Sequence, residues 1–174
     1  PLHKPLGARG LLMQGGFFTY GLVAALAIAL AIAAFTDLRR RQIDNWLNAA
    51  IACGAPLFWL ASQQTWVDIV FHLVIALAMF IMLAGLFALR AMGGGDVKLL
   101  SALALWIEPV LFVKLLMVMS VLGGLLALVV VIWHFSSRRQ GSIAVPYGIA
   151  ISFAGLWALA SQYLPGFSST ILSG

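Results

Sequence analysis

Two aspartates stand out among the five acidic residues of the chain, because each lies at the end of a strongly apolar segment. Asp37 follows the apolar run that ends at Phe35, and Asp96 follows Gly93 to Gly95. An acid at a helix C-terminus opposes the helix dipole, so Asp37 is not expected to be a cap. Asp96 could serve as an N-cap. Because an ionised side chain within a bilayer costs roughly 2.5 to 3.5 kcal/mol on insertion scales, two such acids at one depth indicate a function.

Two neighbouring carboxylates can perform general acid–base catalysis. At a separation of about 4 Å and an effective dielectric of about 20, two unit charges repel each other by about 4 kcal/mol, so both cannot ionise easily. One carboxylate then activates a water as the base, and the other protonates the scissile carbonyl as the acid, as in aspartic proteases. Since the pair shares one proton, the sequence assigns neither role to Asp37 or to Asp96.

The three glycines before Asp96 form the second part of the pattern. Without Cβ atoms, Gly93, Gly94 and Gly95 can adopt positive φ and let an extended peptide approach the backbone closely. An ordinary hairpin loop would have the same composition, but the position next to Asp96 favours a substrate-binding role. The other acids have structural explanations: Asp68 at a helix start, and Asp44 in a surface ion pair.

The composition of the chain is that of a protein embedded in a lipid bilayer. The chain has 174 residues, of which 63% are hydrophobic and 9% charged, and its mean hydropathy is +1.07. These values exclude a soluble globule and a disordered chain. A single cysteine, Cys53, excludes a disulfide framework, and no metal site or cofactor is expected. The net charge of +5 does not come from a basic stripe with interleaved aromatics, so nucleic acid is not an expected partner.

The apolar segments predict an all-α, polytopic membrane protein with six transmembrane helices in a single domain, residues 1–174. The expected helices cover residues 17–35, 46–62, 67–89, 96–107, 111–135 and 143–163. The fourth is short because Glu108 and Pro109 end it. Residues 1–16 and 164–174 are expected to be loop-like.

Basic residues decide the expected orientation. Most of them fall on one side of the six segments, and by the positive-inside rule that side is cytoplasmic, with both termini outside. These residues are Arg39, Arg40, Arg41, Arg90, Lys98, Arg138 and Arg139. Asp37 and Asp96 therefore both lie at cytoplasmic helix ends, where they can meet in a water-filled cleft with the glycines as its gate.

These residues resemble the motifs of the type IV prepilin peptidases, which are Gly-x-Gly-Asp intramembrane aspartyl proteases, and in particular the short members that serve tight-adherence (Flp-type) pili. The matching elements are Asp37 with Arg39–Arg41 and Ile43-Asp44-Asn45, then Gly93-Gly94-Gly95-Asp96-Val97-Lys98, then Val145-Pro146-Tyr147-Gly148-Ile149-Ala150. They cover nearly the whole chain. Asp44 departs from the family pattern, which usually has Pro before Asn45.

The resemblance implies an aspartic endopeptidase of the bacterial cytoplasmic (inner) membrane that removes the basic leader of Flp-like prepilins at the cytoplasmic face. Asp37 and Asp96 would be catalytic. The residues that the resemblance places near the substrate are Gly93, Gly94, Gly95, Lys98, Asn45, Pro146, Tyr147 and Gly148. Ordinary positive-inside anchoring explains Lys98 equally well. Longer members also methylate the new N-terminus and have a region with paired cysteines. This sequence has a single cysteine, so S-adenosylmethionine is not expected as a cofactor here.

Two other functions fit paired intramembrane acids. A proton- or cation-coupled transport subunit would also contain them, although no repeated halves are present in this sequence. A non-catalytic scaffold of a pilus or secretion machine would not need either carboxylate. Replacement of Asp37 or Asp96 by Asn distinguishes a scaffold from a protease. A scaffold keeps its function in these variants, whereas a protease loses cleavage and keeps its fold.

Overall fold

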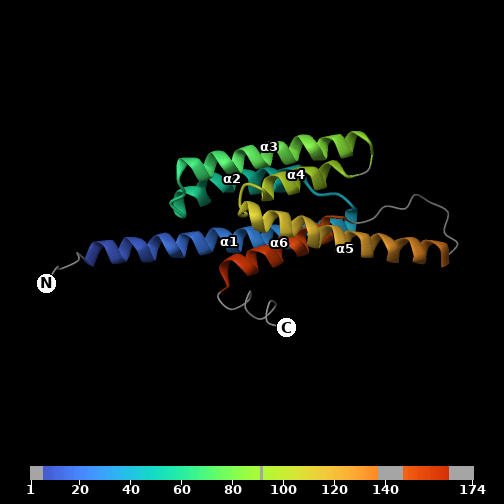
Figure 1. The fold of residues 1–174 in the computed structure, drawn as a ribbon. Helices are drawn as coiled ribbons and strands as arrows, with labels where there is room; N and C mark the ends of the chain where they lie inside the picture. Colours follow the sequence, from blue (N-terminus) through green and yellow to red (C-terminus); the bar gives the residue numbers. More distant parts are fainter. Residues whose placement is uncertain (1–5, 91, 137–146, 165–174) are drawn as a thin grey trace.

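The computed structural model describes residues 6–90, 92–136 and 147–164, and every regular element within these ranges is an α-helix. The helices in chain order are α1 (Leu6–Arg40), α2 (Asn45–Ala61), α3 (Trp66–Ala88), α4 (Gly94–Leu103), α5 (Pro109–Ser136) and α6 (Tyr147–Tyr163). Figure 1 shows an elongated bundle with α2, α3 and α4 along one side and α1, α5 and α6 along the other. The predicted all-α fold is confirmed.

Three of these helices are long and apolar enough to cross a bilayer. They are Gly16–Arg40 within α1, Trp66–Ala88 and Pro109–Trp133 within α5. At about 1.5 Å per residue each covers roughly 35 Å, which exceeds a hydrocarbon core of about 30 Å. The other three are shorter, with 17 residues in α2 and α6 and 10 in α4. The membrane character is thus confirmed, whereas six separate spans with both termini outside stay a prediction.

The first helix begins earlier than the sequence analysis predicted. Residues 1–16 were expected to be loop-like, but α1 is already helical at Leu6. No proline follows Pro5 until the helix has ended at Arg40. Isolated glycines in this stretch cost only about 1 kcal/mol each relative to alanine, and they do not interrupt the helix. The expected loop was therefore wrong from Leu6 onward.

The fourth helix ends at Leu103 rather than at Ile107 because the next carbonyl groups bond to side chains. In a longer helix the Leu105 carbonyl would accept from residue 109, which is a proline without an N–H group. Trp59 of α2 supplies the missing donor, since its Nε1 donates to Leu105 O at 2.9 Å. Nδ1 of the buried His72 lies 3.2 Å from Ala104 O. These bonds hold the α4–α5 turn against α2 and α3.

Helix α6 packs between α1 and α5, and a small residue sets how closely it approaches α1. A Cβ atom added to Gly155 would lie 2.9 Å from Cδ1 of Leu30, which is fully buried. A small residue at this position thus permits the close approach of the two helices. The described part of α6 begins at Tyr147, so the predicted helical residues 143–146 lie outside the described ranges.

Candidate active site

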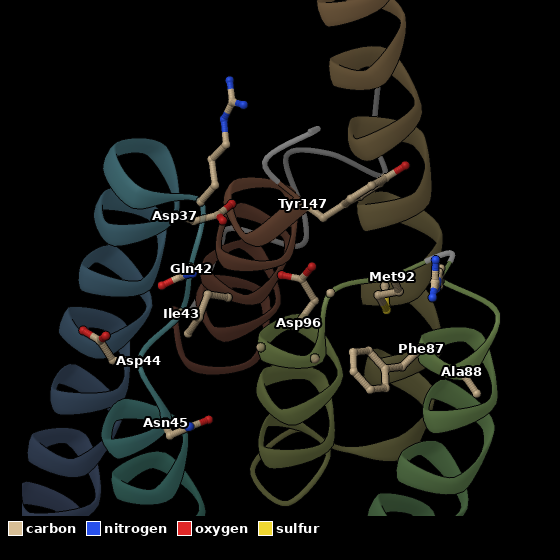
Figure 2. Close-up of a pocket in the computed structure, with 15 residues that line it drawn as sticks. Asp37, Gln42, Ile43, Asp44, Asn45, Phe87, Ala88, Met92, Asp96 and Tyr147 are labelled. Carbon is tan, nitrogen blue, oxygen red and sulfur yellow. The ribbon is translucent and has the colours of Figure 1, made fainter. Parts of the chain in front are cut away.

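Asp37 and Asp96 share one cavity at the end of the bundle where α1 ends and α4 begins. The cavity has a volume of about 970 Å³. Figure 2 shows both carboxylates extending into the same space beside Tyr147. Asp37 is 5% exposed and Asp96 is 9% exposed, and the charge of Asp37 acts on Asp96. Tertiary packing thus brings together the two residues that the sequence analysis selected.

Three helix N-termini border this cavity, those of α2, α4 and α6. The N–H groups of a helix's first turn have no partners within the helix, and the N-terminus has a positive partial charge of roughly half an elementary charge. Arg41 and Arg90 also line the cavity. Both adopt the left-handed conformation, with φ of 53° and 57°, directly after α1 and close to the end of α3. Buried carboxylates are therefore surrounded by groups that favour negative charge.

Asp37 lies in the last turn of α1 and faces the first turn of α6. The backbone N–H groups of Gly148 and Ile149 interact with its carboxylate, as does the positive charge of Arg41. One carboxylate oxygen is still unpaired: Oδ2 of Asp37 is buried and has no hydrogen-bond partner within the described residues. This oxygen is the unpartnered acceptor of the site.

Asp96 lies in the first turn of α4, three residues after the N-cap residue Gly93. The backbone N–H of Gly93 interacts with its carboxylate. A Cβ atom added to Gly93 would lie 2.9 Å from Oδ2 of Asp96, so a side chain there would displace the carboxylate. The alternative that Asp96 is the N-cap residue was wrong, because Gly93 holds that position and Asp96 lies within the first turn of the helix.

The glycines before Asp96 are not the positive-φ loop that the sequence analysis expected. Gly93 has φ of −71°, and Gly94 and Gly95 already belong to α4. Their small size matters for close packing instead. A Cβ atom added to Gly95 would lie 3.2 Å from Cβ and 3.4 Å from O of Ile43, and one added to Gly94 would lie 3.2 Å from the ring of Phe87. The expected positive φ was therefore wrong, while all three glycines line the cavity, where a substrate-binding role for them stays a prediction.

Asn48 is a residue that the sequence analysis missed. It is 4% exposed in the core of α2, and its Nδ2 donates to the carbonyl oxygen of Gly95 at 3.3 Å. Its Oδ1 is buried without a hydrogen-bond partner in the described structure. A buried amide in an apolar helix three residues after Asn45 was the available signal, because such a group must find a partner in another element.

Lys98 lies on another side of α4 from the active-site cavity. Its Nζ donates to Oδ1 of Asn45 at 2.7 Å. Both residues line a second cavity of about 370 Å³ between α2, α3 and α4, and Asn45 also borders the active-site cavity. Asn45 thus borders the cavity that the two aspartates share, whereas Lys98 is not among the lining residues of that cavity.

The motif at the start of α6 divides into three positions. Tyr147 lines the active-site cavity and packs against Gly123 of α5, where an added Cβ would lie 3.1 Å from its ring. Gly148 lies against Asp37. Pro146 lies outside the described residues.

Asp68 and Asp44 lie at the starts of two other helices, α3 and α2. Asp68 forms a capping box with Thr65 at the start of α3, which confirms its structural interpretation. Asp44 is the N-cap residue of α2 but makes no capping hydrogen bond, and it borders the active-site cavity. Within the described ranges, no group of three or more His, Cys, Asp or Glu residues could hold a metal ion.

Comparisons with known proteins show the family of the chain. The chain matches the sequence model of the type IV leader peptidase family over residues 24–132. It is 30% identical over 166 residues to a prepilin leader peptidase/N-methyltransferase of Dickeya chrysanthemi, an alignment that covers 91% of this chain and 56% of that protein. The chain therefore spans slightly more than half the length of this relative. No solved structure matches it.

Proposed function

The chain belongs to the type IV leader peptidase family, and on this basis we propose that it is an intramembrane aspartyl endopeptidase with Asp37 and Asp96 as its catalytic pair. One observation carries the proposal: two buried carboxylates from distant parts of the chain border one cavity. Burial of two interacting acids is costly unless they share a proton, and a shared proton is what hydrolysis by an aspartic dyad requires.

The cavity accounts for the other requirements of peptide hydrolysis. Its volume of about 970 Å³ lies near the upper end of the range of roughly 300 to 1,000 Å³ for ligand sites. Helix N-termini and two arginines around it favour the negative charge that develops on the scissile carbonyl oxygen. The chain's own residues therefore supply the acid, the base and part of the stabilisation of the transition state.

The proposed substrate is the leader of a type IV prepilin of the Flp-like class. The name of the Dickeya relative supports a prepilin, and the resemblance of the motifs supports the Flp-like class. Both aspartates lie at helix ends and share their cavity with Arg41 and Arg90, and by the positive-inside rule these helix ends face the cytoplasm. Cleavage would thus take place at the cytoplasmic face of the inner membrane. We propose the peptidase activity alone, because two carboxylates hydrolyse a peptide but do not transfer a methyl group.

Co-expression with a candidate prepilin tests this function. Mass spectrometry of the pilin should show leader removal with the native chain and none with Asp37→Asn or Asp96→Asn. Asp68→Asn is the matched control, since Asp68 belongs to the capping box of α3 and not to the cavity. Leader removal by either catalytic variant would exclude that residue from the pair and would favour the scaffold alternative.

A further inference from the structure

In the described structure, the N–H groups of Gly148 and Ile149 in the first turn of α6 interact with Asp37, whereas Asp96 interacts with the N–H group of Gly93. From this we propose that Asp37 carries the negative charge of the resting pair and acts as the base, while Asp96 holds the shared proton and acts as the acid. Gly148 is the positioning residue that maintains this division. The inference rests on the proposed peptidase function.

Contact between Gly148 and Asp37 is closer than any side chain would allow. A Cβ atom added to Gly148 would lie 2.8 Å from both Cγ and Oδ2 of Asp37 and 2.9 Å from its Cβ. Real Cβ atoms essentially never come this close to other heavy atoms, and here the neighbour is the short, buried side chain of Asp37. Glycine at residue 148 is therefore what lets the α6 backbone lie directly against the carboxylate.

This close approach places groups that favour a negative charge next to the carboxylate of Asp37. The N–H groups of Gly148 and Ile149 belong to the first turn of α6, where they have no partner within the helix. A helix N-terminus favours an anion. The C-terminus of α1 opposes a charge at Asp37, and α6 together with Arg41 offsets that opposition. An acid at this unfavourable end of its own helix is thus explained by a different helix.

Asp96 has fewer groups that favour its charge. One N–H group, that of Gly93, interacts with its carboxylate, whereas Asp37 interacts with two N–H groups and an arginine. The first turn of α4 adds a favourable contribution, and burial acts against a charge on either aspartate, but the negative charge of Asp37 acts in addition against a charge on Asp96. The other charged residues that line the cavity are Asp44 and Arg90. The balance places the proton on Asp96.

This division defines each proton transfer. Asp37 takes a proton from water as the water oxygen bonds to the scissile carbonyl carbon, and Asp96 gives its proton to the carbonyl oxygen, so a neutral gem-diol forms. Asp37 then returns its proton to the amide nitrogen as the C–N bond breaks. Asp96 recovers a proton from one hydroxyl as the carboxylic acid forms. The pair ends as it began, with Asp37 charged and Asp96 protonated.

Asparagine variants test the division without measuring cleavage, because Asn has the shape of a protonated Asp. In detergent at neutral pH, Asp96→Asn should leave the melting temperature unchanged or higher. Asp37→Asn should lower it by about 3 °C or more, since the charge–helix interaction is lost and an amide has only one acceptor atom. An equal or larger fall for Asp96→Asn would overturn the assignment. Prepilin cleavage is assayed separately, so a failed function and a failed assignment give different results.

Gly148→Ala tests the positioning role through its dependence on Asp37. The variant should reduce cleavage at least about 100-fold and lower the melting temperature, whereas Gly124→Ala, whose added Cβ meets nothing within 4 Å, should do neither. In an Asp37→Gly background all three contacted atoms of residue 37 are gone, so Gly148→Ala should then cause little further loss of stability. The same loss in both backgrounds would show a structural role unrelated to Asp37 and would refute the proposal.

Discussion

Asn48 of α2 donates a hydrogen bond from Nδ2 to the carbonyl oxygen of Gly95 at 3.3 Å and so ties the core of α2 to the residue directly before Asp96. The amide is buried, and its Oδ1 has no hydrogen-bond partner among the described residues. The bond that Nδ2 donates to Gly95 is therefore the hydrogen bond through which this side chain acts. A buried side chain that bonds the peptide directly before Asp96 helps to determine where that aspartate lies.

Asn48→Ala should therefore weaken both stability and cleavage. Removal of the donor leaves the Gly95 carbonyl without this partner, which costs about 1 to 3 kcal/mol, and the start of α4 becomes free to shift. We expect cleavage of a prepilin to fall at least about tenfold, because small displacements of a catalytic group have large effects. Ser120→Ala removes a hydroxyl that bonds within α5 and is the control. Unchanged cleavage in Asn48→Ala would show that Asp96 is positioned without it.

Alanine substitutions of the glycines near Asp96 should differ in a set order. Gly95→Ala meets Cβ and backbone atoms of Ile43, which cannot easily move away, so we expect a clear loss of cleavage. Gly94→Ala meets the ring of Phe87, which is exposed and can rotate, so its effect should be small. Cleavage rates of the two variants, measured side by side, check the order. The reverse order would mean that the glycines act through conformational freedom rather than close packing.

Lys98 and Asn45 should act as a pair. An exposed hydrogen bond of this kind contributes at most about 1 kcal/mol, so Lys98→Met should lower the melting temperature by no more than about 4 °C. If Lys98 acts only through Asn45, the double variant with Asn45→Ala will be no less stable than the worse single variant. A rise in KM for prepilin with Lys98→Met alone, and full additivity in stability, would instead assign Lys98 to substrate binding.

Trp59→Phe tests whether the opposite end of the bundle contributes only to stability. The substitution keeps an aromatic ring but removes the donor to Leu105 O, whose ordinary helical partner would be Pro109. The melting temperature should fall by about 2 to 6 °C, while the rate of prepilin cleavage at a temperature well below melting stays unchanged. A lower rate at constant stability would indicate coupling between the α4–α5 turn and the aspartates.

The sequence by itself determined the features that depend on local pattern and length. Apolar runs predicted the helical fold, and four of the six helices follow the expected boundaries within two residues at the ends that could be compared. Two arguments were enough to select Asp37 and Asp96. An acid at a helix C-terminus is unfavourable to the helix dipole, and an ionised acid within a bilayer has a high free-energy cost. These inferences succeed because helix periodicity, dipole direction and the cost of charge in an apolar segment act over one or two turns.

Only the tertiary structure decided how the site is assembled. The contacts of Gly148 with Asp37, of Asn48 with Gly95 and of Gly95 with Ile43 join residues from different helices. Their spacing along the chain contains no information on how α6 packs against α1 or how α2 packs against α4. The same three glycines, Gly93 to Gly95, would fit either a flexible loop or a closely packed helix start. The structure has the second, in which Ile43 would lie 3.2 Å from a Cβ atom at Gly95 and the Asp96 carboxylate 2.9 Å from one at Gly93.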